Sequence, residues 1–291
     1  AMVTQLTGAV INIIMDPILI FGYFGFPRME VAGAAAATVL GQIVAAIMAV
    51  VMNLKCNPDV NIRLREIRWN GHVAGEIYRV GFPSIVMQSI GSVMVFGMNK
   101  ILFGFTKTAT AVFGAYFKLQ SFIFMPVFGL NNGMVPIVAY NFGAGRMDRV
   151  KKTVKLAVCT AVAIMAVGLA IFQLAPELLL SFFDASEEML EIGSVALRII
   201  SLSFLLAGFC IIAGSVCQAI GNPFYSLIVA VARQLVVLLP VAWLLSRSGR
   251  LELVWVAFPV AELMSLTLSA IFLRRTLRSA EARVAGTPRQ T

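Results

Sequence analysis

Long apolar stretches alternate with short polar segments along the whole chain. Most of the stretches are close to the roughly 20 residues that an α-helix needs to cross a bilayer. Inside a bilayer no water bonds to the backbone, and a helix satisfies its own N–H and C=O groups. The pattern therefore predicts an all-α, polytopic membrane protein with eight transmembrane helices. We expect these spans at Leu6–Phe24, Val31–Asn53, Val80–Phe103, Ala109–Tyr140, Thr153–Leu174, Leu190–Ile220, Tyr225–Leu245 and Leu251–Leu273.

The fourth and sixth spans are longer than a bilayer requires, so they must tilt, bend or project into water. In the fourth span, Pro126 and Pro136 each remove a backbone donor, which favours a bend. Gly133 lies between them and permits close approach of other backbone. We predict that these three residues serve gating or bending. A tight re-entry into the next polar loop would use the same residues.

Charged residues are few and unevenly placed. The chain is 59% hydrophobic and 13% charged with a mean hydropathy of +0.90, whereas soluble domains carry about 25% charged residues. The loops after the second and fourth spans and the C-terminal segment hold most of the 23 lysines and arginines, the distribution typical of cytoplasmic loops. We therefore expect a multi-pass protein of the cell inner (plasma) membrane with both termini in the cytoplasm. The net charge of +9 then reflects topology and contact with membrane lipids rather than nucleic acid.

The longest polar connection, residues 55–79, predicts a boundary between two helical groups. Residues 1–54 would form a pair of helices, residues 80–275 a group of six, and residues 276–291 a basic cytoplasmic tail.

The first and last pairs of spans resemble each other, with Pro17 corresponding to Pro240. Two halves with the same orientation are a common transporter plan. On that plan the first pair ends one six-helix lobe, and four more helices are expected before it.

Asp16 is a carboxylate in the middle of the first apolar stretch. Charges at membrane depth are costly and mostly mark ion or proton sites. Asn12 lies one helical turn away on the same face, and Pro17 leaves the carbonyl of Ile13 without its helix partner. Such oxygens suit a proton or a hard cation. The alternative is a carboxylate neutralised by a neighbouring helix, with a kink that serves packing.

The second span has a seam of small residues, including Gly33, Ala37 and Gly41, which predicts close approach of another backbone. Thr38 lies one position round from that seam, at a depth where its hydroxyl completes the Asn12 and Asp16 oxygen set. A hydroxyl bonded to its own helix backbone is the other interpretation of Thr38.

Four other ionisable side chains lie well inside the expected spans. We predict that Glu262 pairs with Arg233 or Arg198 as a structural ion pair, and a role in substrate binding is the alternative. Lys118 is expected to extend to the membrane surface.

Flexible and polar side chains are expected to line a substrate cleft. Methionine and aromatic side chains make an adaptable wall for flat ligands. The candidates are Gln42, Met87, Met98, Phe122 and Met125.

The residues do not favour an enzyme or a bound cofactor. Cys56, Cys159, Cys210 and Cys217 lack metal-ligand spacing, and His72 is the only histidine. There is no H-E-x-x-H motif and no convincing carboxylate pair. A membrane scaffold without transport activity is a further class that the residues leave open.

Four segments together resemble the multidrug and toxic compound extrusion (MATE) family. They are N-x-x-x-D-P at Asn12–Pro17, GAAAATVLGQ at Gly33–Gln42, FMPVFGLNNGMVPIVAYNFGAG at Phe124–Gly145, and SVCQAIGNP at Ser215–Pro223. The resemblance extends to about Arg275.

The resemblance implies twelve helices in two pseudo-symmetric six-helix lobes, of which this chain looks like helices five to twelve. It implies alternating access and export of cationic amphipathic drugs in exchange for H⁺ or Na⁺, by a protein expected to act as a monomer. The family's cation site carries over to Asn12, Asp16 and Thr38, with Pro17 as a bending residue beside it. The glutamate early in the seventh helix of a sodium-coupled branch has no counterpart here. A flippase for lipid-linked oligosaccharides, from the same wider group, is the alternative.

Overall fold

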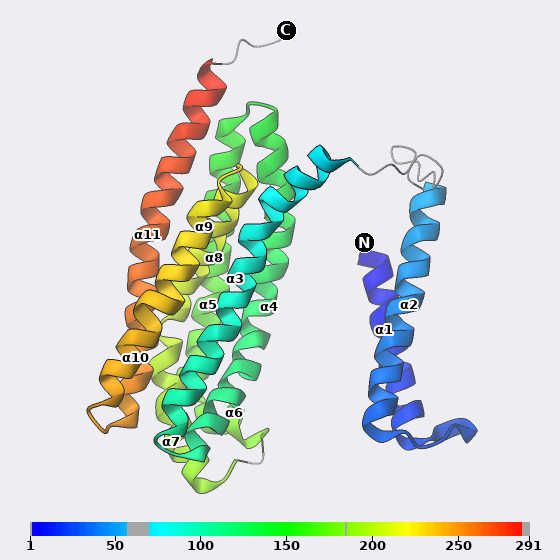
Figure 1. Cartoon of the computed structure of the whole chain (residues 1–291), viewed down its shortest axis with the longest axis vertical. Coiled ribbons are helices and arrows are strands. Elements are labelled where there is room, and N and C mark those ends of the chain that lie inside the picture. Colours follow the sequence, from blue (N-terminus) through cyan, green and yellow to red (C-terminus); the bar gives the residue numbers. More distant parts are fainter. Residues whose placement is uncertain (1, 57–69, 184, 287–291) are drawn as a thin grey trace. The chain divides into compact units, whose positions relative to one another are not determined.

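A computed structural model describes residues 2–56, 70–183 and 185–286, which are helical apart from short connections (Figure 1). The chain forms two compact units, Ala1–Gly71 and His72–Thr291, and each is described by itself. The helices are α1 (Met2–Phe21), the short 3₁₀ turn η1 (Tyr23–Gly25), α2 (Glu30–Cys56), α3 (Gly71–Phe103), α4 (Lys107–Gly143), α5 (Met147–Leu174), α6 (Pro176–Ser181), α7 (Glu187–Ser201), α8 (Phe204–Ala219), α9 (Pro223–Val231), the π-helical η3 (Ala232–Leu238), α10 (Leu239–Ser246) and α11 (Leu251–Gly286).

The number of spans agrees with the sequence pattern. Among the described residues, seven helices are long and apolar enough to cross a membrane, and α7 with α8 makes an eighth as a pair bent by 49°. The all-helical, multi-pass architecture predicted from the sequence is therefore confirmed.

The first unit is a tight hairpin of α1 and α2. A Cβ added at Gly33 would lie only 2.4 Å from the carbonyl oxygen of Leu19, and one at Gly41 would lie 2.8 Å from that of Gly8. Glycine is required at these points because any side chain would meet backbone. The seam of small residues in the second span thus packs directly on α1, as its spacing predicted.

The second unit contains α3 to α11 around one apolar core. Aromatic side chains fill its centre: the rings of Phe172 and Phe204 lie 5.0 Å apart, and those of Phe124 and Phe204 lie 5.4 Å apart. Trp255 and Phe113 are also fully buried. Such ring pairs add to the dispersion energy that holds helices together where lipid gives no hydrophobic drive.

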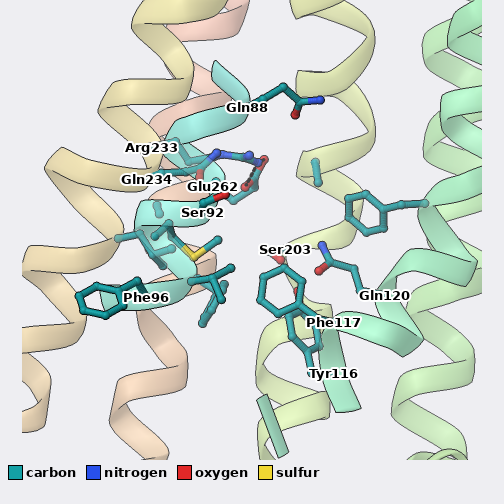
Figure 2. A pocket seen from close by; sticks show the side chains of 18 of the residues that line it. Gln88, Ser92, Phe96, Tyr116, Phe117, Gln120, Ser203, Arg233, Gln234 and Glu262 are labelled. Carbon is teal, nitrogen blue, oxygen red and sulfur yellow. Dashed lines mark hydrogen bonds and ion pairs between the residues drawn. The ribbon is translucent and has the colours of Figure 1, made fainter. Parts of the chain in front are cut away.

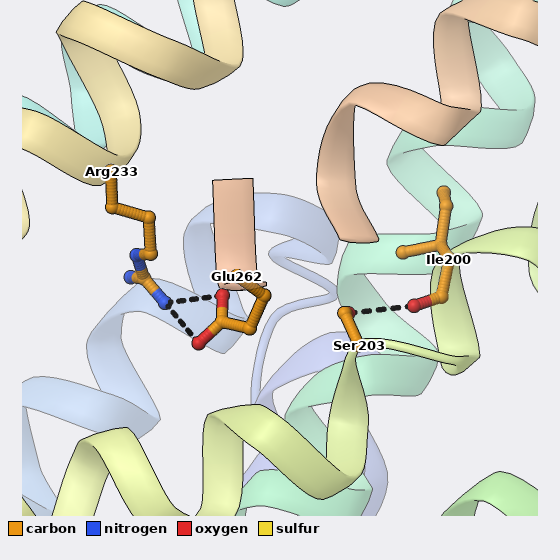
Figure 3. Close-up of polar contacts among 4 residues, drawn as sticks. All are labelled: Ile200, Ser203, Arg233 and Glu262. Carbon is orange, nitrogen blue, oxygen red and sulfur yellow. Dashed lines mark hydrogen bonds and ion pairs between the residues drawn. The ribbon is translucent and has the colours of Figure 1, made fainter. Parts of the chain in front are cut away.

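The sixth predicted span is broken between α7 and α8. Side chains satisfy the backbone groups that the break releases: Gln173 Nε2 donates to the carbonyl of Arg198 at 2.8 Å, and Ser203 Oγ donates to that of Ile200 at 2.7 Å (Figure 3). This compensation is what an interrupted helix needs inside a membrane.

The seventh predicted span also departs from a regular α-helix. Residues 232–238 form a π-helix, with Pro240 just beyond it. Proline cannot donate to the carbonyl of Val236, whereas the i→i+5 pattern of a π-helix uses the N–H one residue later. By contrast, α4 continues as one helix through Pro126 and Pro136, and the gating roles of these prolines and Gly133 stay a prediction.

Some helices extend beyond the predicted spans. α3 begins at Gly71, so the last part of the predicted 55–79 linker is helical, and α11 continues to Gly286 through most of the predicted tail. Hydropathy marks where lipid ends, whereas the helix-forming residues Arg, Leu, Ala and Glu carry α11 onward. Residues 57–69 of the linker and 287–291 of the tail lie outside the described residues.

We expect Gly33→Ala to weaken the α1–α2 hairpin by about 1–3 kcal/mol, because its new methyl group overlaps the Leu19 carbonyl. Gly114→Ala in α4 is the matched control: a Cβ there meets nothing within 4 Å, and alanine favours a helix by up to about 1 kcal/mol. The measurement is the SDS fraction that unfolds each variant in mixed micelles. Equal resistance of the two variants would contradict the close packing.

Candidate functional site

Three predicted site residues meet inside the first unit. Asn12 on α1 donates through Nδ2 to Thr38 Oγ1 on α2, at 3.2 Å. The Thr38 hydroxyl donates in turn to the carbonyl of Ala34 at 2.9 Å. Thr38 thus bonds to its own helix and also accepts from Asn12, and its part in a cation site stays a prediction.

Asp16 completes this cluster from one turn along α1. With the Asn12 amide turned over, its nitrogen lies 3.3 Å from Asp16 Oδ2 and its oxygen accepts from the backbone N–H of Thr38 at 3.2 Å. Turning the Asn12 amide over therefore replaces an acceptor facing Asp16 by a donor, and a donor facing Thr38 by an acceptor.

One oxygen of Asp16 has no partner. Oδ1 is buried and makes no hydrogen bond to any residue in the described part of the chain. A buried carboxylate oxygen without a partner is costly, and such groups usually take up a proton, an ion or a water molecule. Pro17, next in α1, cannot donate to the Ile13 carbonyl, which leaves a further oxygen nearby in the helix. The cluster has the chemistry to hold a proton or a hard cation.

The second unit contains the ion pair. Nη1 of Arg233, on η3, lies 3.2 Å from Oε2 and 3.5 Å from Oε1 of Glu262, on α11 (Figure 3). Glu262 is buried, and about a third of the Arg233 side chain is exposed. Arg198, the other predicted partner, has an exposed side chain on α7 and is not part of this pair.

The ion pair lies in the wall of a pocket of about 790 Å³ within the second unit (Figure 2). Amide, hydroxyl and aromatic side chains from five segments form most of the remaining wall. They are Gln88, Ser92, Phe96, Asn99, Tyr116, Phe117, Gln120, Phe124, Phe128, Ser203, Gln234 and Phe258.

The lining of this pocket does not include the predicted cleft residues of this unit, and their place in a substrate cleft stays a prediction. Met98 is fully buried in the core, so no ligand reaches it in this structure. Phe122 and Met125 are 73% and 65% exposed and are not among the α4 residues that line the pocket. Hydropathy identifies the span but does not tell which stripe of it faces a pocket.

The remaining predicted residues are two cleft candidates, Met87 and Gln42, and Lys118. Met87 is half-buried next to the pocket residue Gln88, and Gln42 is exposed on α2 of the first unit. Lys118 is exposed, with its Nζ 5.8 Å from the ring centroid of Phe183, an arrangement typical of a cation–π contact.

Sequence reasoning missed the pocket's glutamines. Gln88, Gln120 and Gln234 each lie in an apolar span, and an amide at membrane depth is a signal of the same kind as Asp16. A search for charged side chains in apolar spans does not identify them, because an amide carries no charge.

Comparison with known proteins gives the family. The MatE family model matches residues 83–244, more than half of the chain. The chain is 30% identical to the multidrug export protein MepA of Staphylococcus saprophyticus over 256 residues, which are 88% of this chain and 55% of that protein. It is 28% identical to MepA of Staphylococcus haemolyticus over 280 residues, which are 96% of this chain and 60% of that protein.

Solved structures of similar fold cover nearly the whole chain. A MOP superfamily transporter from Pyrococcus furiosus matches 96% of this chain with a TM-score of 0.87 and 22% identity, over 63% of its own length. A MATE structure in complex with MaL6 matches 97% of this chain with a TM-score of 0.85 and 23% identity, over 63% of its own length.

The chain thus spans little more than half the length of the curated relatives it matches. Those relatives are named as transporters and not as enzymes. On the family model and the MepA identity together, the chain belongs to the MatE (MATE) family of membrane transporters, as the motifs in its sequence indicated.

Proposed function

We propose that this chain works in secondary active efflux, in which entry of H⁺ or Na⁺ drives export of cationic amphipathic molecules. The observation that carries the proposal is the buried Oδ1 of Asp16, which lacks a partner among the described residues. The names of the MepA relatives, multidrug export proteins, support the cargo.

Coupling follows from the charge at Asp16. An ionised Asp16 at membrane depth is destabilised, and a bound proton or cation neutralises it. If the two membrane-facing conformations differ in how much they bury this carboxylate, the ion favours one of them by the difference in affinity. Export then requires only that cargo favours the other conformation.

Asn12 and Thr38 suit both states of Asp16. The Asn12 amide can donate to Asp16 Oδ2 when the carboxylate is charged, or present its oxygen when an ion or proton arrives. Thr38 can bind the amide in either orientation while its hydroxyl proton goes to the Ala34 carbonyl. Its hydroxyl oxygen accepts from the amide nitrogen, or its backbone N–H donates to the amide oxygen at 3.2 Å. Apart from the coupling ion, this scheme uses no metal or organic cofactor.

The flippase alternative is less well supported. A lipid-linked sugar brings a pyrophosphate, which needs a surplus of positive charge. Arg233 is the one cationic side chain among the described residues that line the pocket of the second unit, and Glu262 offsets it. We propose that the protein acts as a monomer in the inner membrane, with both termini cytoplasmic.

Asp16→Asn should abolish ion-driven export, because an uncharged amide cannot exchange a cation. We expect ethidium efflux from cells expressing the full-length chain to fall by about tenfold or more, with protein level unchanged. Thr7→Val is the matched control, since the Thr7 hydroxyl lies on α1 and donates to the Val3 carbonyl at 2.9 Å. Retained efflux in Asp16→Asn would remove Asp16 from the mechanism.

Thr38→Val should weaken ion binding, whereas Thr38→Ser should preserve it. One neutral hydrogen bond contributes about 0.5–1.5 kcal/mol, so the ion concentration for half-maximal efflux should rise by about twofold to tenfold. Efflux is measured against Na⁺ at fixed pH and against pH without Na⁺, and the titration that Thr38→Val shifts identifies the coupling ion. If neither titration shifts, Thr38 has no part in the site.

A further inference from the structure

Aromatic side chains gather in the turn that joins α1 to α2. Phe21, Tyr23, Phe24 and Phe26 are each at least half exposed, and Phe24 is 88% exposed. The turn projects from the end of the hairpin (Figure 1). Exposed apolar side chains that gather in one place mark a surface for contact with a membrane or a partner. The turn is therefore a candidate contact surface as well as a connection.

The backbone of the turn holds Phe24 in an unfavourable conformation. Its φ of 59° and ψ of 27° are left-handed, which is rare for a bulky residue. Gly22 has a φ of 76°, and a Cβ there would lie 2.8 Å from the carbonyl oxygen of Phe26. The N–H of Phe26 donates to the carbonyl of Tyr23 at 3.3 Å. The turn thus has a defined, strained shape, although the Phe24 ring gains little packing among the described residues.

The position of the turn places it at the surface of the hydrocarbon. Val3–Phe21 and Glu30–Lys55 are both long and apolar enough to span a membrane. The 19 residues of the first span cover about 28 Å, close to the hydrocarbon thickness of roughly 30 Å. Residues 22–29 therefore lie where the headgroups begin. Aromatic rings are among the side chains that membrane proteins place in this layer.

The turn carries no net charge. Arg28 and Glu30 are the only charged residues between positions 21 and 31. Nε of Arg28 lies 3.6 Å from Oε1 of Glu30, and both side chains are 69% exposed. A basic segment would be attracted to anionic headgroups, whereas this neutral turn gains no such attraction. Its affinity for a lipid surface must come from burial of its apolar area.

We propose that residues 21–29 form an interfacial anchor, which inserts its aromatic rings among the phospholipid headgroups and the adjoining ends of the acyl chains. The partner is the lipid surface itself, without a preference for an anionic headgroup. The anchor fixes the depth of the hairpin and with it that of Asp16, which lies five residues before Phe21. The inference depends on α1 and α2 as membrane spans and not on the cargo or the coupling ion.

The depth of the turn is measured with Phe24→Trp in the full-length chain, reconstituted in phosphatidylcholine vesicles. The lipid is brominated either near the headgroup end or near the middle of its acyl chain. The signal of the three native tryptophans is removed by subtracting the wild type in the same vesicles. We expect the shallow bromine to quench the new fluorescence at least about twofold more than the deep one, because the turn lies near the headgroups.

Val167→Trp is the matched control for depth. Val167 is 61% exposed on α5 and lies about 10 Å before the end of that helix at Leu174. Its fluorescence should respond more to the deep bromine. For Phe24→Trp, iodide quenching without bromine quenching would place the turn in water, and quenching by neither would place it against protein. Either result overturns the proposal.

A second pair of variants separates anchoring from folding, with Tyr23→Trp as the reporter of depth. The double change Phe24→Gly with Phe26→Ser removes two rings but suits the backbone, because glycine adopts a positive φ readily and Phe26 is extended. We expect unchanged resistance to SDS and shallow-bromine quenching reduced by about twofold. The control, Phe24→Leu with Phe26→Leu, keeps apolar area and should keep the quenching. Unchanged quenching in the first double variant would overturn the proposal.

The lipid composition tests the neutral character of the anchor. Phosphatidylglycerol added to the vesicles should leave the quenching of Phe24→Trp unchanged, because the turn has no surplus of positive charge. Insertion that requires the anionic lipid would contradict an apolar anchor. Asp16→Asn should leave the same quenching unchanged, so a failure of the proposed export and a failure of the anchor are distinguishable.

Discussion

Inside a bilayer, every polar group must find a partner within the protein, because lipid offers none. This constraint explains most of the polar geometry of the chain. Gln173 and Ser203 satisfy carbonyls at the α7–α8 break, and a π-helix accommodates the proline that follows it. A buried oxygen without a hydrogen-bond partner, such as Asp16 Oδ1, is therefore an exception that calls for a ligand.

The two units meet the constraint in different ways. In the first, Asp16 has polar neighbours, and its Oδ1 has no hydrogen-bond partner among the described residues. In the second, Arg233 neutralises the carboxylate of Glu262. The neighbouring Gln234 Oε1 has no hydrogen-bond partner among the described residues.

The sequence predicted what depends on local composition and spacing. Apolar length predicted the spans, helical spacing placed Asn12 beside Asp16, and depth along two antiparallel helices placed Thr38 near both. The choice of Arg233 over Arg198 could not be predicted, because it depends on which face of each helix turns inward.

The residues that line the pocket could not be predicted from the sequence either, for the same reason. Its wall combines stripes of several helices with a π-helical segment that shifts the usual helical spacing. Met98 shows the difficulty, since a methionine in the core and one in a cleft have the same local sequence pattern.

The close contact of α1 with α2 has a mechanical consequence. Backbone meets backbone at Gly33 and at Gly41, and the N–H of Met29 donates to the carbonyl of Leu19 at 3.0 Å across the connecting turn. Neither helix can roll against the other without a steric collision. A displacement at Asp16 is therefore transmitted to the whole hairpin as rigid-body motion, and the carboxylate and the helix beside it move together.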